Sequence, residues 1–90
     1  MAKASVDPEE LRRFAFELKH FSTEMQTQVA TIHRRFTKLG ETWRDEEHAK
    51  FAEEFEQMLR SLAKFIDVSE KQVPLLLRKA EAISNYLNQR

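Results

Sequence analysis

The chain of 90 residues contains a single glycine, Gly40, and only two prolines, Pro8 and Pro74. Glycine and proline are the strongest local markers of turns, so a sheet of short strands has almost no residues from which to build its turns. Charged residues make up 33% of the sequence, and its many Glu, Lys, Leu, Arg and Ala residues favour long helices. We therefore predict an all-α fold without strands, in a single domain spanning residues 1–90.

The first helix is predicted over residues 8–39. Asp7 can cap it, Pro8 suits the first helical position, and Glu10 completes an arrangement similar to a capping box. Apolar residues then recur at steps of three and four, interrupted only at Gln28, as on one face of an amphipathic helix. They are Leu11, Phe14, Leu18, Phe21, Met25, Ile32 and Leu39, with Ala15, Val29 and Phe36 widening the stripe. Gly40 is expected to end this helix in the left-handed conformation.

The second helix is predicted over residues 43–73, after a turn at 40–42, with Thr42 as its cap and carboxylates in its first turn. A connection this short makes the two helices antiparallel, and at about 1.5 Å per residue each is roughly 45 Å long, so they match end to end. The apolar positions again follow helical spacing. They are Phe51, Phe55, Met58, Leu59, Leu62, Phe65, Ile66, Val73, Leu76, Ala80, Ile83 and Leu87.

Pro74 interrupts this second pattern. It cannot donate a hydrogen bond to the carbonyl of Glu70, and its ring crowds the preceding turn. We expect a kinked continuation or a separate C-terminal helix over residues 74–88, overhanging the hairpin. Apolar residues in this segment need to be covered, by folding back or by another chain. The candidate partner-binding tail comprises Leu76, Ile83, Tyr86 and Leu87.

The hairpin cannot hide both apolar stripes. Each helix buries one side against the other and leaves the flanks exposed, and a chain of this length has only a small core. A dimer that forms a four-helix bundle is the simplest solution. Its core or dimer face is predicted to comprise Phe14, Leu18, Phe21, Met25, Ile32, Phe51, Phe55, Leu59, Leu62, Phe65 and Ile66. Phe16 falls away from this face, as an isolated surface hydrophobe or as part of a second contact surface.

Composition excludes several classes of function. The absence of cysteine excludes disulfides and thiolate metal sites. Fifteen Lys and Arg residues balance fifteen Asp and Glu residues, so there is no excess positive charge to attract nucleic acid or an acidic membrane. No apolar run reaches the roughly 20 residues of a membrane span, and residues 1–10 do not resemble a signal peptide. We expect a cytoplasmic protein without stable membrane insertion, which if secreted uses a route independent of a signal peptide.

Two pairs, Glu17 with His20 and Asp45 with His48, have the one-turn carboxylate and imidazole spacing of di-iron bundles. They lie about 36 and 6 Å from the turn, too far apart to share an ion within one chain. We predict no metal or other cofactor and place the histidines on the solvated surface. No Ser or Cys has a base beside it, and one glycine excludes a phosphate-binding loop. The sequence therefore indicates no catalytic residues and no enzyme.

The segment Leu39-Gly40-Glu41-Thr42-Trp43 places the only glycine and the only tryptophan three residues apart at the bend. With two antiparallel heptad helices in about a hundred residues, the chain resembles the WXG family of small, early-secreted-antigen-like proteins exported by type VII secretion systems. In that family Trp-x-Gly forms the turn, and here Asp45 stands at the position of the glycine. The turn motif is assigned to Gly40, Trp43 and Asp45. The family's export signal is Tyr-x-x-x-Asp/Glu, whereas Tyr86 is followed four residues later by Arg90.

The resemblance implies a homodimer or a heterodimer with a similar hairpin protein, in a bacterium. It also implies a role as a secreted substrate or a dimeric partner or chaperone of a type VII system, with a secretion ATPase as a further candidate partner. The alternative is an intracellular coiled-coil adaptor or immunity-type binding module unrelated to secretion. Asp45 and Arg90, which depart from the two family motifs, are the arguments for that alternative.

Overall fold

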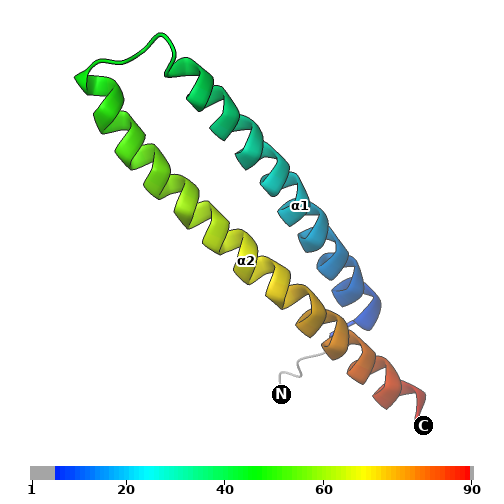
Figure 1. Ribbon diagram of the computed structural model, residues 1–90. Helices are drawn as coiled ribbons and strands as arrows, with labels where there is room; N and C mark the ends of the chain where they lie inside the picture. Colours follow the sequence, from blue (N-terminus) through cyan, green and yellow to red (C-terminus); the bar gives the residue numbers. More distant parts are fainter. Residues whose placement is uncertain (1–5, 90) are drawn as a thin grey trace.

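The computed structural model of the protein describes residues 6–89 and consists of two helices (Figure 1). Helix α1 spans Pro8–Leu39 and helix α2 spans Glu46–Asn88. They run antiparallel in a rod of 69 × 26 × 15 Å, with the connecting loop at one end, here the loop end, and Pro8 and Asn88 at the other, the open end. No strand occurs among the described residues. The predicted all-α helical hairpin is thus confirmed.

The start of α1 is set by its capping residues. Asp7 has an extended backbone, and its carboxylate accepts a hydrogen bond from the N–H of Glu9 at 2.9 Å. Pro8 occupies the first turn, where its missing N–H would have no partner in any case. Helix α1 has the bounds that the sequence predicts for the first helix.

The loop is longer than predicted. It spans residues 40–45 instead of 40–42, and α2 starts at Glu46 instead of residue 43. Asp45 is the cap, because its carboxylate accepts a hydrogen bond from the N–H of His48 at 3.0 Å. The hydroxyl of Thr42, the predicted cap, instead donates to the carbonyl of Leu39 at 3.4 Å. A carboxylate is preferred at a cap and also interacts favourably with the helix dipole.

Gly40 does not adopt the left-handed conformation predicted for it. Its φ of −66° and ψ of −11° are right-handed, because the winding of α1 continues past its last residue with tighter bonds. The N–H of Glu41 donates to the carbonyl of Lys38 at 3.0 Å, and the N–H of Thr42 donates to the carbonyl of Leu39 at 3.1 Å. The glycine matters for space instead. A Cβ at this position would lie 3.3 Å from the carbonyl oxygen of Thr37 and 3.5 Å from Nε2 of His48.

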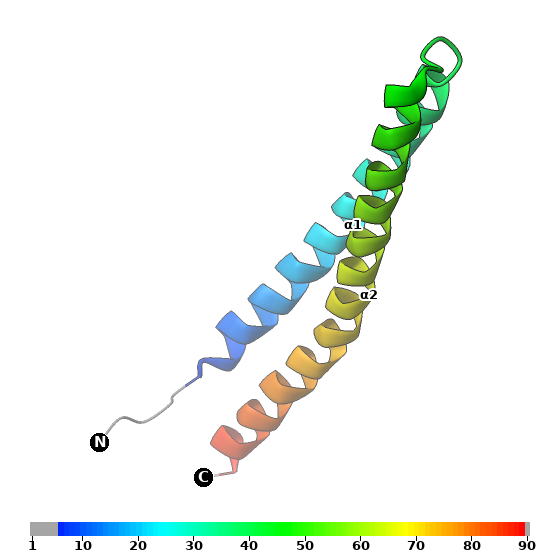
Figure 2. The same cartoon turned by 90° about the vertical axis from the view of Figure 1, so that its left-hand side faces the viewer.

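Helix α2 continues through Pro74 to Asn88 and curves along its length (Figure 2). Of the two predicted forms of this segment, the structure has the continuation and not the separate C-terminal helix. Val73 and Ala80, on either side of the proline, are buried against α1, and this burial offsets the lost backbone hydrogen bond. The overhang is also shorter than predicted. A hydrogen bond of 3.1 Å from Arg12 to Ser84 still joins the helices near the open end, so only the last turns of α2 extend beyond α1.

The contact line between the helices, which we define by the buried residues, has small side chains on α1 and both small and large side chains on α2. The buried residues are Ala15 and Ser22 of α1 and Phe55, Ile66, Ser69, Val73 and Ala80 of α2. Alanine and serine at these positions let two helices approach closely. Two hydrogen bonds between the helices, from Arg12 to Ser84 and from Gln26 to Glu70 at 3.0 Å, have partners 14 residues apart on both helices and fix the antiparallel register.

Candidate interaction surface

The predicted apolar stripe of α1 faces α2 only in part, through Ala15, which is buried, and Phe36, which packs on Phe55. Phe14 and Phe21 are 54% and 48% exposed, and Ile32 and Leu39 are similarly exposed, while Leu11, Leu18 and Met25 are half-buried. Phe14 and Phe21 directly precede Ala15 and Ser22, so they lie about 100° around the helix from the contact line. The part of the stripe that contains Phe14 and Phe21 therefore occupies a flank of the hairpin.

The apolar residues of α2 are likewise of two kinds, some packed against α1 and others exposed on a flank. Of the predicted core residues, Phe55 and Ile66 are buried, and Leu59 and Leu62 are half-buried. Phe51 and Phe65, seven residues on either side of Met58, remain exposed with it. Val68, Leu75 and Tyr86 continue this exposed flank toward the open end.

The exposed flanks of α1 and α2 lie on the same side of the hairpin. The rings of Phe21 and Phe65 meet edge to face with centroids 6.3 Å apart, so the two flanks form one continuous surface, here the apolar face. It comprises Phe14, Phe21, Ile32 and Leu39 of α1 and Phe51, Met58, Phe65, Val68, Leu75 and Tyr86 of α2. Exposed hydrophobic residues gathered in this way mark an interaction site, whereas scattered ones need no explanation.

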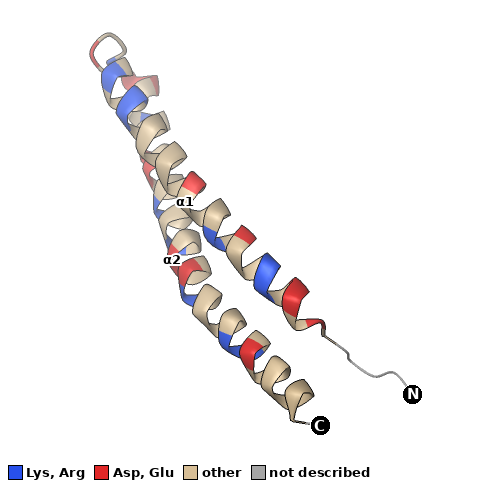
Figure 3. Cartoon of the chain, turned by 90° about the vertical axis from the view of Figure 1, so that its right-hand side faces the viewer, with Lys and Arg blue, Asp and Glu red and all other residues tan. Residues whose placement is uncertain are grey.

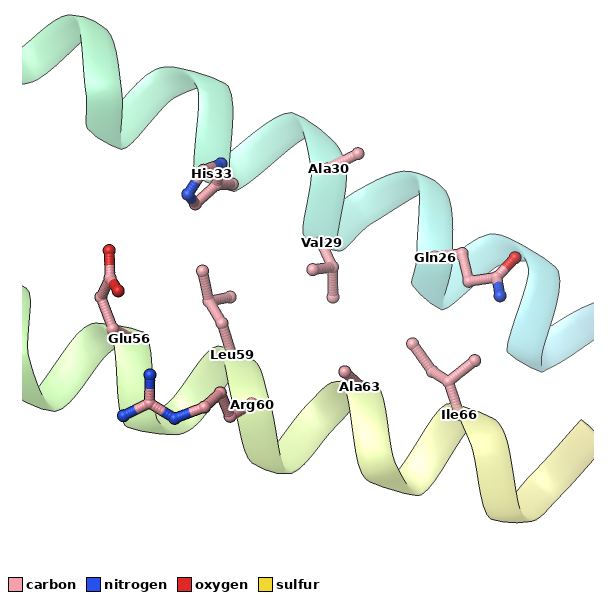
Figure 4. Close-up of a pocket in the computed structure, with 9 residues that line it drawn as sticks. All are labelled: Gln26, Val29, Ala30, His33, Glu56, Leu59, Arg60, Ala63 and Ile66. Carbon is pink, nitrogen blue, oxygen red and sulfur yellow. The ribbon is translucent and has the colours of Figure 1, made fainter.

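The opposite side, here the polar face, holds the hydrogen bonds between the helices. Gln26 comes five residues after Phe21, and Glu70 comes five residues after Phe65. A step of five residues turns about 140° around a helix, so the Gln26–Glu70 bond lies on the other side of the hairpin from the two rings. Charged residues of both signs lie along both helices (Figure 3). The polar face contains a groove of about 470 Å³ with an apolar floor and a polar rim (Figure 4). It is lined by Gln26, Val29, Ala30, His33, Glu56, Leu59, Arg60, Ala63 and Ile66.

Aromatic rings close the loop end of the hairpin. Trp43 lies edge to face on His48 at 4.9 Å and also contacts Phe51, with ring centroids 6.0 Å apart. Phe36 of α1 stacks parallel on His48 at 5.2 Å and packs on the buried Phe55 at 4.8 Å. The tryptophan of the predicted turn motif thus covers the end of the hairpin core.

The two carboxylate and histidine pairs have separate structural roles. Asp45 caps α2, and His48 is half-buried with its Nε2 enclosed and without a hydrogen-bond partner among residues 6–89. The placement of His48 on the solvated surface is therefore wrong, because Phe36 and Trp43 cover its ring. His20 is exposed, 3.8 Å from Glu24. Within the described part of the chain, His, Cys, Asp and Glu form no group of three or more that could hold a metal ion.

The residues of the predicted partner-binding tail differ in how far they are exposed. Leu76 and Ile83 are half-buried, whereas Tyr86 and Leu87 are 71% and 49% exposed. Arg90, which stands where the family's export signal has Asp or Glu, lies outside the described residues. Neither described helix has a stretch apolar and long enough to cross a membrane.

Phe16 is 56% exposed, in agreement with its predicted position away from the core. It directly follows Ala15, whereas Phe14 directly precedes that residue. Phe16 therefore lies on the polar side of the contact line, opposite the apolar face. Its comparable exposure makes it a matched control for substitutions in that face.

Comparison with known proteins agrees with this architecture. The sequence model of the family WXG100, proteins of 100 residues with WXG, matches residues 3–89. The crystal structure of the secreted protein EsxB from Bacillus anthracis strain Sterne is similar, with a TM-score of 0.77 and 30% identity over 96% of this chain and 98% of that chain. The crystal structure of wild-type EsxB in space group P21, also from Bacillus anthracis, gives a TM-score of 0.78 at 30% identity, over 94% of this chain and 99% of that chain.

A variant of the same Bacillus anthracis protein has a TM-score of 0.75 and 30% identity over 93% of this chain and 97% of that chain. Among curated proteins, none matches the sequence.

Proposed function

We propose, from the premise that this chain belongs to the WXG100 family, that it acts in a type VII-like secretion system as a substrate or dimeric partner. In this role it recognises other helices by packing its apolar face against them and performs no catalysis. The similarity to EsxB, which is a secreted protein, supports export of this chain by the same kind of route.

The observation that carries the proposal is the apolar face. Phe14, Phe21, Phe51 and Phe65 are each about half exposed in the isolated hairpin. Complete burial of a phenylalanine side chain is worth about 1.5 to 3 kcal/mol, so a partner that covers several of these rings gains substantial free energy. Because these rings lie beside the contact line and not in it, the hairpin keeps its own packing when the face is free.

The departure of Asp45 from the family motif has a local explanation that removes it as an argument against a role in secretion. Asp45 is the N-cap of α2, and glycine is also accepted at that position of a helix. Around it the turn has specific contacts: Arg44 donates from Nε to the carbonyl of Gly40 at 3.1 Å, and Trp43 packs on His48. Aspartate at this position is therefore compatible with the capping role that glycine can also have.

The proposal is tested with the double variant Phe21→Glu/Phe65→Glu and the control Phe16→Glu in a bacterial host with a type VII system. Association is measured by sedimentation velocity of the purified proteins together with their partner from the host. Export is measured as the chain recovered from the medium, with and without the secretion ATPase. We expect the double variant to lose association and export, because two carboxylates would be buried, and the control to retain both.

Association and export of the double variant at the level of the unmodified chain would show that the apolar face is not the recognition surface. A chain that associates but never leaves the cell, whether or not the ATPase is present, would instead support the intracellular adaptor.

A further inference from the structure

We propose that Met58 is a redox-sensitive modification site, at which oxidation of the thioether by a peroxide disables the apolar face. The proposal rests on the proposed function and adds to it a means of regulation. Two observations carry it: the exposure of Met58 in the free hairpin, and the polar residue that lies beside it on α1 at the middle of the apolar face.

Side-chain sulfur in this chain is confined to methionine, since the sequence has three methionines and no cysteine. Met58 is 48% exposed, whereas Met25 is half-buried and Met1 lies outside the described residues. An oxidant reaches an exposed sulfur more readily than a covered one. Of the two described methionines, Met58 should therefore react first.

Met58 lies in the middle of the exposed flank of α2. Phe51 and Phe65, seven residues before and after it, are 45% and 48% exposed. Seven residues correspond to two helical turns, so the three side chains lie on the same side of the helix. A partner that covers both rings must also cover the sulfur of Met58.

On α1 the neighbouring position is polar. The rings of Phe21 and Phe65 meet across the two helices. In an antiparallel pair, seven residues later on α1 and seven residues earlier on α2 reach one common level again, at Gln28 and Met58. Gln28 is exposed and is the position at which the apolar repeat of α1 is interrupted. Met58 is therefore the apolar member of this pair, and its loss would divide the apolar face into two parts.

Oxidation by hydrogen peroxide is a two-electron step. A lone pair of the methionine sulfur attacks one peroxide oxygen, the O–O bond breaks, and an S–O bond forms while the second oxygen leaves as water after proton transfer. Sulfur is oxidised and peroxide is reduced. The sulfoxide is polar, so its burial under a partner without a hydrogen-bond donor is unfavourable. Methionine sulfoxide reductases reverse the reaction.

The first experiment locates the oxidation in the purified full chain. The chain is treated with hydrogen peroxide for increasing times, digested, and analysed by mass spectrometry for the gain of one oxygen atom in each peptide. We expect Met58 to be oxidised several times faster than Met25. Equal rates at the two residues, or faster oxidation of Met25, would overturn the assignment of Met58.

The second experiment measures association before and after oxidation, by sedimentation velocity of the purified chain, alone and with its partner from the host. We expect oxidation to weaken association by about tenfold or more, and treatment with methionine sulfoxide reductases to restore it. Met58→Leu, which keeps an apolar side chain of similar volume, should associate and be insensitive to peroxide. The matched control Met25→Leu should remain sensitive.

A third variant separates the polarity of the side chain from other effects of peroxide. Met58→Gln should weaken association without any oxidant, and its circular dichroism should match that of the unmodified chain, because Met58 lies outside the contact line.

The remaining outcomes separate this proposal from the proposed function. Unchanged association of the chain oxidised at Met58, or a Met58→Leu variant that peroxide still disables, would overturn the role of Met58 and leave the proposed function intact. A reduced, unmodified chain that does not associate at all would overturn both, because the apolar face would then have no recognition role to regulate.

Discussion

Small residues of α1 lie where this helix touches α2. Ala15 and Ser22 are 0% and 1% exposed, although the larger apolar residues Phe14 and Phe21 directly precede them and are about half exposed. The distance between two packed helices depends on the side chains at their contact, and small residues allow the closest approach. The bulky residues are consequently displaced to the flank, where they form the apolar face.

The buried ring of Phe55 should dominate the stability of the loop end. It is 7% exposed and packs on Phe36 at 4.8 Å and on Phe51 at 5.5 Å. We expect Phe55→Ala to lower the free energy of unfolding by about 3 to 5 kcal/mol, and Phe16→Ala, at an exposed position, by less than about 1 kcal/mol. Urea denaturation followed by circular dichroism, at one fixed protein concentration, measures both changes. Similar losses in the two variants would contradict the burial of Phe55.

Asp45 provides a second prediction at this scale, because it occupies the position at which the family has glycine. Its carboxylate accepts the N–H of His48, so Asp45→Ala should cost about 1 kcal/mol, whereas Asp45→Gly should cost only a few tenths. Thermal and urea unfolding of the two variants provide the comparison. If glycine costs as much as alanine, Asp45 has a role in the turn beyond capping.

At the scale of the helices, the sequence predicts the hairpin and the bounds of α1 but not the rotation of α1 about its axis. Asp7 and Pro8 are local signals that act within one helical turn, which is why they locate the start of α1. The apolar stripe through Phe14 and Phe21 lies beside the line through Ala15 and Ser22. Periodicity alone does not tell which of these neighbouring lines faces α2, because both have helical spacing.

The end of α2 could not be predicted for a related reason. Pro74 is unfavourable in the interior of an isolated helix, and this local rule predicts an interruption. Burial of Val73 and Ala80 against α1 depends on the tertiary register and overrides the local rule. The aromatic surroundings of His48 could not be predicted either, because Phe36 and Trp43, whose rings contact it, lie outside α2 and are brought to it by the loop.

Replacement of Pro74 should strengthen α2. The residue is exposed within a continuous helix, and alanine is favoured over proline there by up to about 3 kcal/mol. We expect Pro74→Ala to raise the free energy of unfolding measured in urea, and the exposed control Gln72→Ala to change it by less than about 0.5 kcal/mol. A lower stability of Pro74→Ala would mean that the curvature at this residue is needed to keep Val73 and Ala80 against α1.

The molecule as a whole is a rod and not a globule. Its radius of gyration is 20.2 Å, whereas a compact domain of 90 residues has a radius of about 12 Å. Such a rod has only one layer of contact, between α1 and α2, so a large share of its apolar residues stays at the surface until another molecule covers them. Its stability is therefore linked to association.

This linkage predicts a thermal midpoint that depends on protein concentration. For the unmodified chain, each tenfold increase in concentration should raise the midpoint by a few degrees, since association stabilises only the folded form. The midpoint of Phe21→Glu/Phe65→Glu should not change with concentration. Circular dichroism melting curves over a range of concentrations test this, and a constant midpoint for the unmodified chain would contradict the linkage.

The location of Pro8 and Asn88 at one end of the rod has a mechanical consequence. A force that pulls these two residues apart acts across the helices and not along them. It loads the contacts nearest the open end first, at Arg12 and Ser84, then those at Ala15 and Ala80, and it reaches the rings beside the loop last. The two helices then separate one helical turn at a time, starting at the open end. This sequential separation needs far less force than the simultaneous shearing of all contacts in a fold.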